Sequence, residues 1–146
     1  MTDLTVTPTS DRPGAATDTD ELVAIATPHA PAAIGPYSQA VRVGGLLFVS
    51  GQLPIDPATG EFAGSGAREQ ATQSLRNAVA ILEAAGTSAD RVAKTTVLLT
   101  DMDDFTTVNE VYSEFFAGDV LPARAAFAVA ALPKGARVEI EMIAAV

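Results

Sequence analysis

Cysteine and tryptophan are absent from this sequence of 146 residues, and only 5% of its residues are aromatic. A chain without cysteine has no disulfide, no thiolate nucleophile and no thiolate ligand for a metal ion, which fits the reducing conditions of the cytoplasm. Because aromatic side chains are scarce, any hydrophobic core must be built mainly from Ala, Val, Leu and Ile.

Basic residues are also scarce, because 9 Lys and Arg residues stand against 18 Asp and Glu residues. The formal net charge is −9 at pH 7. Nucleic acids and anionic membrane surfaces are bound mainly through clustered Lys and Arg side chains. We therefore expect neither nucleic acid nor a membrane as a partner.

Long apolar runs are missing as well, since none approaches the roughly 20 residues of a membrane-spanning helix. Residues 1–21 lack the basic start and apolar core of a signal peptide, so we expect a cytoplasmic protein. Thr, Asp, Pro, Ser, Ala and Gly dominate residues 1–20 and bury too little apolar surface to stay ordered. We predict a flexible N-terminal extension over residues 1–21, with a partner-binding arm as the alternative.

Residues 22–146 have the length of a single domain. Short apolar runs bounded by Gly and Pro predict strands. Between two of these runs, Gly44-Gly45 predicts a two-residue hairpin turn in which glycine supplies the positive φ angles. The expected strands cover residues 22–27, the two arms of 41–49, 91–99, 124–131 and 137–146, and residues 52–61 are expected to form a loop.

A period of 3.6 residues predicts two helices. The first covers residues 67–85, with Gly86 as its C-terminal cap and an apolar stripe of Ala71, Leu75, Ala78, Leu82 and Ala85. The second covers residues 103–116, capped by Asp101 or Asp103, and its inward side chains are Phe105, Val108, Val111, Tyr112, Phe115 and Phe116. This order of elements predicts an α+β fold in which two helices cover one face of a mixed β-sheet.

The last two predicted strands carry candidate polar residues. Because side chains alternate along a strand, Glu139 and Glu141 share one face and Arg124 shares another strand's face with Ala126. If the turn at 133–135 pairs these strands as a hairpin, Arg124 and a glutamate approach each other on one surface. An arginine beside carboxylates most often forms only a salt bridge, so the pattern alone leaves both interpretations open.

Other candidates are weak when taken singly. Tyr37 follows a turn at Gly35-Pro36, and most such tyrosines only pack. Asn109 lies beside the stripe of the second helix, where either a side-chain hydrogen bond or solvent exposure explains it. His29 has no nucleophile motif near it, and no cluster of His, Cys or acidic residues has the spacing of a metal site.

Several segments nevertheless form a recognisable set. They are APAAIGPYSQA at 30–40, LFVSGQLP at 47–54, residues 70–86 with Gln73, Asn77 and Leu82, VNEVY at 108–112, LPAR at 121–124, LPK at 132–134 and VEIE at 138–141. Together, over about residues 23–145, they resemble the reactive-intermediate deaminase family, also called the YjgF-type family.

The resemblance implies a chorismate-mutase-like α+β fold and a homotrimer with a barrel-like core and three clefts between subunits. It implies a hydrolase that deaminates reactive enamine and imine intermediates, of the 2-aminoacrylate and 2-aminocrotonate type, to 2-oxo acids and ammonia. Such a 2-iminobutanoate/2-iminopropanoate deaminase uses no cofactor and no metal. By position, Arg124 binds the substrate carboxylate, Glu139 handles the attacking water, and Tyr37, Ser50, Gly51 and Asn109 line the cleft.

One position departs from the family. Ala126 stands where many members have a cysteine, and the resemblance assigns this residue a main-chain contact to the substrate, which alanine retains. The alternatives are a non-catalytic small-acid-binding or regulatory member, a ribonuclease or translation inhibitor, and a chorismate-mutase-type enzyme. The presence of Arg124 with Glu139 argues against the first, the acidic composition against the second, and fold alone implies no function.

Overall fold

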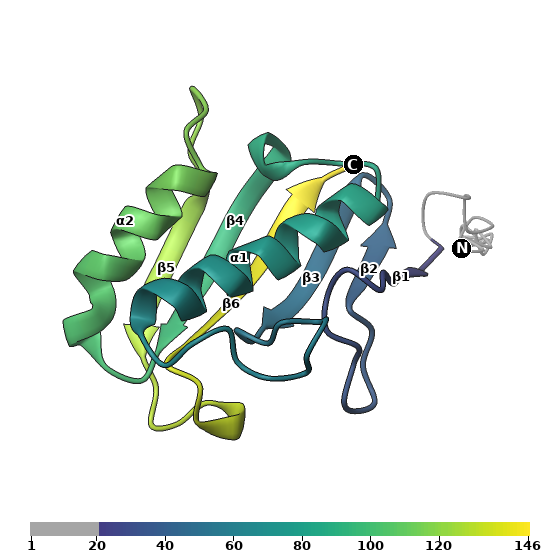
Figure 1. Ribbon diagram of the computed structural model, residues 1–146. Coiled ribbons are helices and arrows are strands. Elements are labelled where there is room, and N and C mark those ends of the chain that lie inside the picture. Colours follow the sequence, from purple (N-terminus) through teal and green to yellow (C-terminus); the bar gives the residue numbers. More distant parts are fainter. Residues whose placement is uncertain (1–20) are drawn as a thin grey trace, which may run out of the picture.

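Six strands form one sheet in the order β1-β2-β3-β6-β4-β5 in the computed structural model, which describes residues 21–146 (Figure 1). The predicted extension therefore lies outside the described residues, except for Glu21. The strands are β1 Val23–Ile25, β2 Ala40–Val43, β3 Leu46–Gln52, β4 Val92–Leu99, β5 Ala123–Ala128 and β6 Val138–Ala145. Neighbouring strands are antiparallel except β4 and β5, so the sheet is mixed, as predicted.

The predicted hairpin joins β2 to β3. Val43 pairs with Leu46, so Gly44 and Gly45 form a two-residue turn. Only Gly44 has a positive φ angle, 56°, whereas positive φ angles were expected of both glycines. A turn with positive φ at its first central residue alone is of the type II′ kind, which also matches the twist of antiparallel strands.

Both helices lie on one face of the sheet, α1 at Ala67–Ala84 and α2 at Phe105–Phe115 (Figure 1). Gly86 caps α1 as predicted, with a φ of 80° and its N–H donated to the Glu83 carbonyl at 3.0 Å. α2 begins later than predicted because a 3₁₀ turn, Met102–Asp104, precedes it. The Asp101 side chain caps that turn by accepting the Asp103 N–H at 2.9 Å. In the described residues, neither helix is long and apolar enough to cross a membrane.

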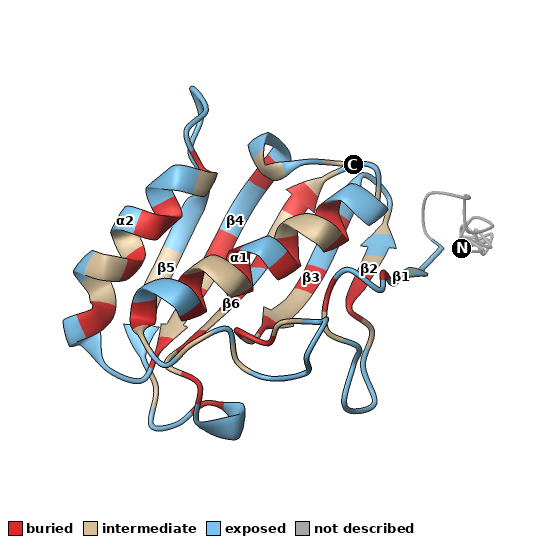
Figure 2. Ribbon diagram, viewed as in Figure 1, coloured by how far each residue is buried: buried red, intermediate tan, exposed pale blue. Residues whose placement is uncertain are grey.

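The core between helices and sheet is mainly aliphatic. Figure 2 shows where its buried residues lie on the helices and strands. Val138, Ile140 and Met142 of β6 point into it, while Glu139 and Glu141 point to the opposite, open face, as the alternation predicted. Four residues of the predicted stripe, Ala71, Leu75, Ala78 and Leu82, are buried in α1, and Ala85 is half-buried just past its end. Three polar residues of the same helix are buried beside them: Gln70, Ser74 and Asn77. Periodicity did not mark them, because a polar residue is assigned to the solvent side of an amphipathic helix.

The open face of the sheet carries large apolar side chains. Leu46 and Phe48 of β3 are each 43% exposed, and Phe127 of β5 is 48% exposed. The strands that carry them have no layer of helix on this side (Figure 1). An apolar surface of this kind is typical of an interface with another chain.

The last two strands do not form the hairpin that was considered for them. β4 lies between β5 and β6, pairs in parallel with β5 and pairs antiparallel with β6. The physical reason is that α2 lies between β4 and β5 in the sequence and returns the chain to the end of the sheet where β4 began. A strand that follows such a crossover helix runs parallel to the strand before it. Arg124 consequently lies on the helix side of the sheet, and Glu139 lies on its open face.

Candidate functional site

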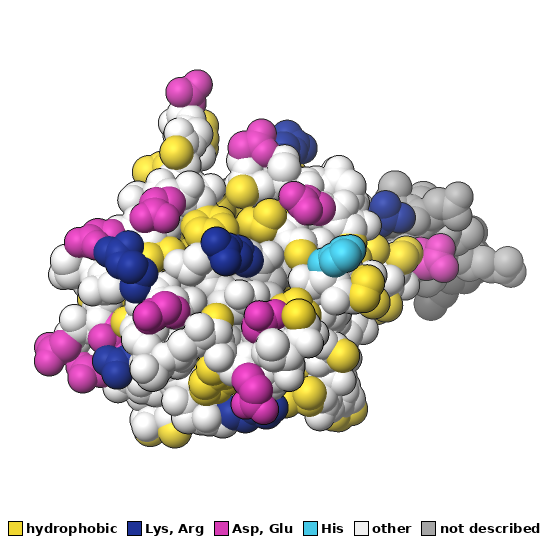
Figure 3. All heavy atoms as spheres, viewed as in Figure 1, with side chains coloured by type: hydrophobic (Ala, Val, Ile, Leu, Met, Phe, Trp, Pro, Cys, Tyr) yellow, Lys and Arg dark blue, Asp and Glu magenta, His cyan; other side chains and the backbone are white. Residues whose placement is uncertain are grey.

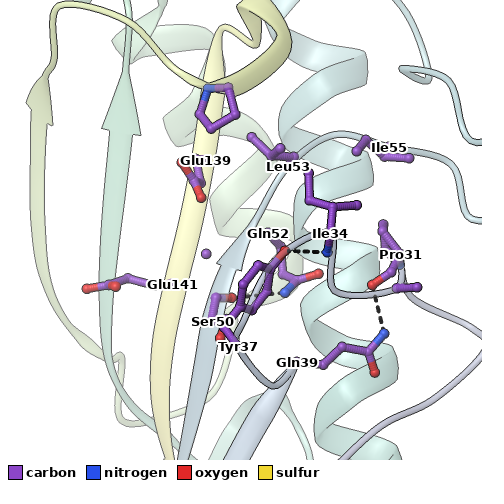
Figure 4. Close-up of a pocket in the computed structure, with 13 residues that line it drawn as sticks. Pro31, Ile34, Tyr37, Gln39, Ser50, Gln52, Leu53, Ile55, Glu139 and Glu141 are labelled. Atoms are coloured by element: carbon purple, nitrogen blue, oxygen red, sulfur yellow. Dashed lines mark hydrogen bonds between the residues drawn. The ribbon is translucent and has the colours of Figure 1, made fainter.

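A cavity of about 510 Å³ lies where β3 ends and β6 begins (Figure 4). It brings together four of the residues proposed from the sequence: Tyr37, Ser50, Gly51 and Glu139. Figure 4 shows two sides to it, with Glu139 and Glu141 of β6 on one and Pro31, Ile34 and Ile55 on the other. The cavity therefore combines a carboxylate side with an apolar side, as small-molecule sites do.

A β-bulge shapes the carboxylate side. Val49 pairs with Met142 and Gln52 with Ile140, so both Ser50 and Gly51 stand opposite the single residue Glu141. Such a bulge bends the strand and redirects its side chains and main chain. It carries the main chain of Gly51 toward the carboxylate of Glu139.

Gly51 makes this close approach possible without moving the carboxylate. A Cβ atom built on Gly51 would lie 2.3 Å from Oε1 of Glu139, well inside the contact distance of carbon and oxygen. Any side chain at position 51 would therefore displace the carboxylate. The glycine and the glutamate therefore form one contact unit in the cavity.

The Glu139 carboxyl is a stronger base than an ordinary glutamate. Partial burial raises its pKa, because the charged form loses solvation, and the neighbouring Glu141 carboxylate raises the pKa further. A carboxylate whose pKa moves toward the working pH accepts a proton from water more readily. This property fits the predicted role of Glu139 in handling a water molecule.

Ser50 and Tyr37 shape the loop that covers the cavity. The Ser50 hydroxyl donates to the Ser38 carbonyl at 2.6 Å, and the Ile34 N–H donates to the Tyr37 hydroxyl at 3.3 Å. Ser50 is therefore engaged with the loop rather than free as a nucleophile. Tyr37 is 49% exposed, so its ring stands at the mouth of the cavity and can contact a ligand.

Gln39 is a structural residue of the site that we did not identify from the sequence. Its buried amide accepts the Thr27 N–H at 2.7 Å and donates to the carbonyls of Thr27, Ala30 and Pro31 at 3.1, 3.2 and 2.7 Å. These bonds fold the 27–31 segment into one wall. A glutamine next to the apolar start of β2 was the available signal, because buried amides must be hydrogen-bonded.

The two remaining predicted side chains form a second cluster on the helix side. Nη1 of Arg124 donates to Oδ1 of Asn109 at 2.7 Å, and the guanidinium carbon lies 4.7 Å from the centre of the Tyr112 ring and 5.7 Å from that of Phe105. The Tyr112 hydroxyl is in turn bonded to the Thr95 hydroxyl at 2.8 Å. Amide and ring contacts hold the guanidinium in place without neutralising it.

Arg124 thus differs from the salt-bridge arginine that the sequence left as an alternative. Within residues 21–146, ion pairs are made by Arg68 and by Arg137, whose fork grips Asp104 at 2.8 and 2.9 Å, and none is made by Arg124. A positioned guanidinium with an unpaired charge is suited to a carboxylate ligand. The side chain of Ala126 packs against the core, so only its main chain is available to a ligand.

Within residues 21–146, the lining of the cavity is acidic rather than basic. On the helix side, Lys and Arg side chains stand in small groups among acidic ones (Figure 3). The residues lining the cavity include two glutamates and no Lys or Arg. In the described part of the chain, no three His, Cys, Asp or Glu residues are grouped so that they would hold a metal ion.

Comparison with known proteins gives consistent results. The sequence model of the family described as endoribonuclease L-PSP matches residues 27–146. A RutC family protein of Sinorhizobium fredii is 61% identical over 119 residues, which cover 82% of this chain and 94% of the relative. The 2-iminobutanoate/2-iminopropanoate deaminase of Mus musculus is 58% identical over 120 residues, covering 82% of this chain and 88% of the relative. The crystal structure of E. coli TdcF with bound serine has a TM-score of 0.81 at 46% identity and covers 85% of this chain and 98% of that one.

Proposed function

We propose, from the premise that this chain belongs to the endoribonuclease L-PSP (YjgF-type) family, that it hydrolyses 2-imino acids and their enamine tautomers to 2-oxo acids and ammonia. The observation that carries the proposal is the Glu139 carboxylate, which lies over the Gly51 main chain in the cavity with a pKa raised by burial. The mouse relative named 2-iminobutanoate/2-iminopropanoate deaminase supports the substrate class. We place the enzyme in the cytoplasm, because a chain without cysteine needs no oxidising compartment for disulfide formation.

The proposed reaction needs an oriented water and a fixed substrate. Arg124 binds the substrate carboxylate through two N–H donors. Glu139 takes a proton from a water molecule while the oxygen of that water attacks the imine carbon. The π electrons of the C=N bond move to nitrogen, which takes up the proton that Glu139 removed from water. When the resulting carbinolamine collapses, its hydroxyl proton passes to nitrogen and the C=O bond forms as the C–N bond breaks, so ammonia leaves and the 2-oxo acid remains.

A homotrimer is part of the proposal. Arg124 and Glu139 of one chain lie on opposite faces of the sheet, so a single protomer does not bring them to one substrate. A neighbouring copy that covers the open face would place its Arg124 beside this cavity. The exposed Phe48 and Phe127 on that face support such an interface.

A coupled assay tests the proposed activity. A serine or threonine dehydratase releases the enamine, and the formation of 2-oxo acid is followed with and without this protein. We expect faster release at micromolar protein. An unchanged rate would contradict the deaminase proposal.

A non-catalytic small-acid-binding role is the second candidate, favoured by the serine named in the E. coli TdcF structure. It predicts binding of serine or a 2-oxo acid in calorimetry together with an unchanged rate of imine hydrolysis. Calorimetry and the hydrolysis assay, made on the same preparation of the protein, therefore distinguish the two candidate functions. Cleavage of RNA is disfavoured, since the described cavity presents carboxylates to a phosphate backbone.

A further inference from the structure

Helix α1 turns a row of polar side chains inward. Asn77 is 1% exposed and Ser74 is fully buried. The aliphatic side chains of the stripe offer neither of them a hydrogen-bond partner. Burying an amide is costly unless its donors and acceptors are bonded. The partners of Asn77 therefore show what the residue does.

Asn77 bonds to the loop that follows β3. Its Nδ2 donates to the carbonyl of Leu53 at 3.0 Å and to that of Ile55 at 2.8 Å. Its Oδ1 accepts from Nε2 of Gln73 at 2.8 Å, which fixes the orientation of the amide. Both loop partners are acceptors, so only a donating group at position 77 satisfies them.

The tethered residues form a wall of the cavity. Leu53 and Ile55 line it, and Figure 4 shows Ile55 on the apolar side, away from Glu139. Further along, the loop is closed on itself by the Ala63 N–H, which donates to the Pro54 carbonyl at 3.0 Å. Asn77 is thus the contact through which helix α1 holds the loop at Leu53 and Ile55. Nε2 of Gln70 donates to the carbonyl of Gly64 at 3.0 Å and holds the far end of the same loop.

We propose that Asn77 is a positioning residue that sets the size selectivity of the site for the substrate side chain. This inference rests on the proposed deaminase function. With the carboxylate and the imine carbon at the polar side, the substrate side chain points to Leu53 and Ile55. Their position then decides how well a second carbon in that side chain is packed, and one methylene in an apolar pocket changes kcat/KM by about 10- to 200-fold.

The test compares 2-iminobutanoate with 2-iminopropanoate as substrates of Asn77→Ala and of the matched control Ser74→Ala. Ser74 is buried on the same face of α1, but its hydroxyl has no hydrogen-bond partner in the described residues, so its removal releases no loop. We expect Asn77→Ala to lower the ratio of kcat/KM for the larger over the smaller substrate about tenfold or more, with the change mainly in KM. Ser74→Ala should keep the ratio of the parent.

A second variant keeps the inference testable if Asn77→Ala folds poorly. Gln73→Met keeps the helix and removes only the bond that orients the Asn77 amide, so a smaller change of the ratio in the same direction is expected. Equal losses on both substrates, or an unchanged ratio in a folded Asn77→Ala, would overturn the inference and leave Asn77 with a purely structural role.

Hydrogen exchange provides a readout that does not require activity. Amides of residues 53–64 should exchange faster in Asn77→Ala than in the parent and in Ser74→Ala, because the tether of the loop is lost. A parent without deaminase activity contradicts the proposed function, while the exchange rates still decide whether Asn77 positions the wall. Unchanged exchange in that loop would refute the tether itself.

Discussion

At the scale of single residues, the contact between Gly51 and Glu139 leaves no room for a side chain at position 51 unless the Glu139 carboxylate moves. We predict that Gly51→Ala lowers kcat about a hundredfold, because the added Cβ collides with Oε1 of Glu139 and a misplacement of about 1 Å costs that much. Gly45→Ala is the matched control, since a Cβ there meets no heavy atom within 4 Å. Steady-state kinetics of the two variants checks this. Equal activity of Gly51→Ala and Gly45→Ala would show that the carboxylate tolerates displacement.

The raised pKa of Glu139 has a consequence for stability. The folded protein holds the Glu139 proton more tightly than the unfolded chain does, so stability falls as the pH rises from the ordinary value of 4.5 through the raised pKa. We predict that Glu139→Gln, which does not titrate, gains stability relative to the parent over this interval. Urea unfolding at pH 4 and pH 7 measures the difference between the two proteins. A difference that is the same at both pH values would contradict the prediction.

At the scale of elements, the unit β4-α2-β5 presents Arg124. The parallel pairing places β5 at the edge of the sheet, where Asn109 and Tyr112 of α2 hold the guanidinium. A charged hydrogen bond contributes about 1.5–3 kcal/mol, and a carboxylate accepts two from a guanidinium fork. We predict that Arg124→Ala lowers kcat/KM for imino acids about a hundredfold or more.

The control for Arg124→Ala is Arg68→Ala. Arg68 is also an arginine at the helix layer, but it is paired with Glu110 in an exposed salt bridge on α1 and α2. Such surface pairs contribute little, so both stability and kcat/KM should stay close to those of the parent. If Arg124→Ala assembles properly and deaminates as fast as Arg68→Ala, the carboxylate-binding role of Arg124 is wrong.

At the scale of the whole molecule, the exposed apolar side chains on the open face of the sheet fit the proposed trimer interface. We predict that light scattering gives a mass near three times that of the 15.0 kDa chain. Phe127→Glu should shift the mass toward the monomer, because a carboxylate replaces an apolar side chain on the proposed interface. Met102→Glu, at a residue that is 44% exposed in the turn before α2, should leave the mass unchanged. A parent of monomer mass would remove both the trimer and the shared site.

Much of the fold was predictable because its signals are local. Each expected strand and helix falls on an observed element, since apolar periodicity and the Gly and Pro positions act over a few residues. The same alternation correctly placed Glu139 and Glu141 opposite Val138 and Ile140. Errors at the ends have local causes too, such as the 3₁₀ turn that delays the start of α2.

The sequence by itself therefore determined the elements, the aliphatic core, the side-chain faces of the strands and the family. Only the tertiary structure decided that β4 separates β5 from β6, which puts Arg124 and Glu139 on opposite faces of the sheet. It alone decided that Asn77 bonds to the loop at Leu53 and Ile55. The physical reason is that strand pairing and buried polar contacts join residues far apart in the chain, and a local pattern records which way a side chain points but not what it meets.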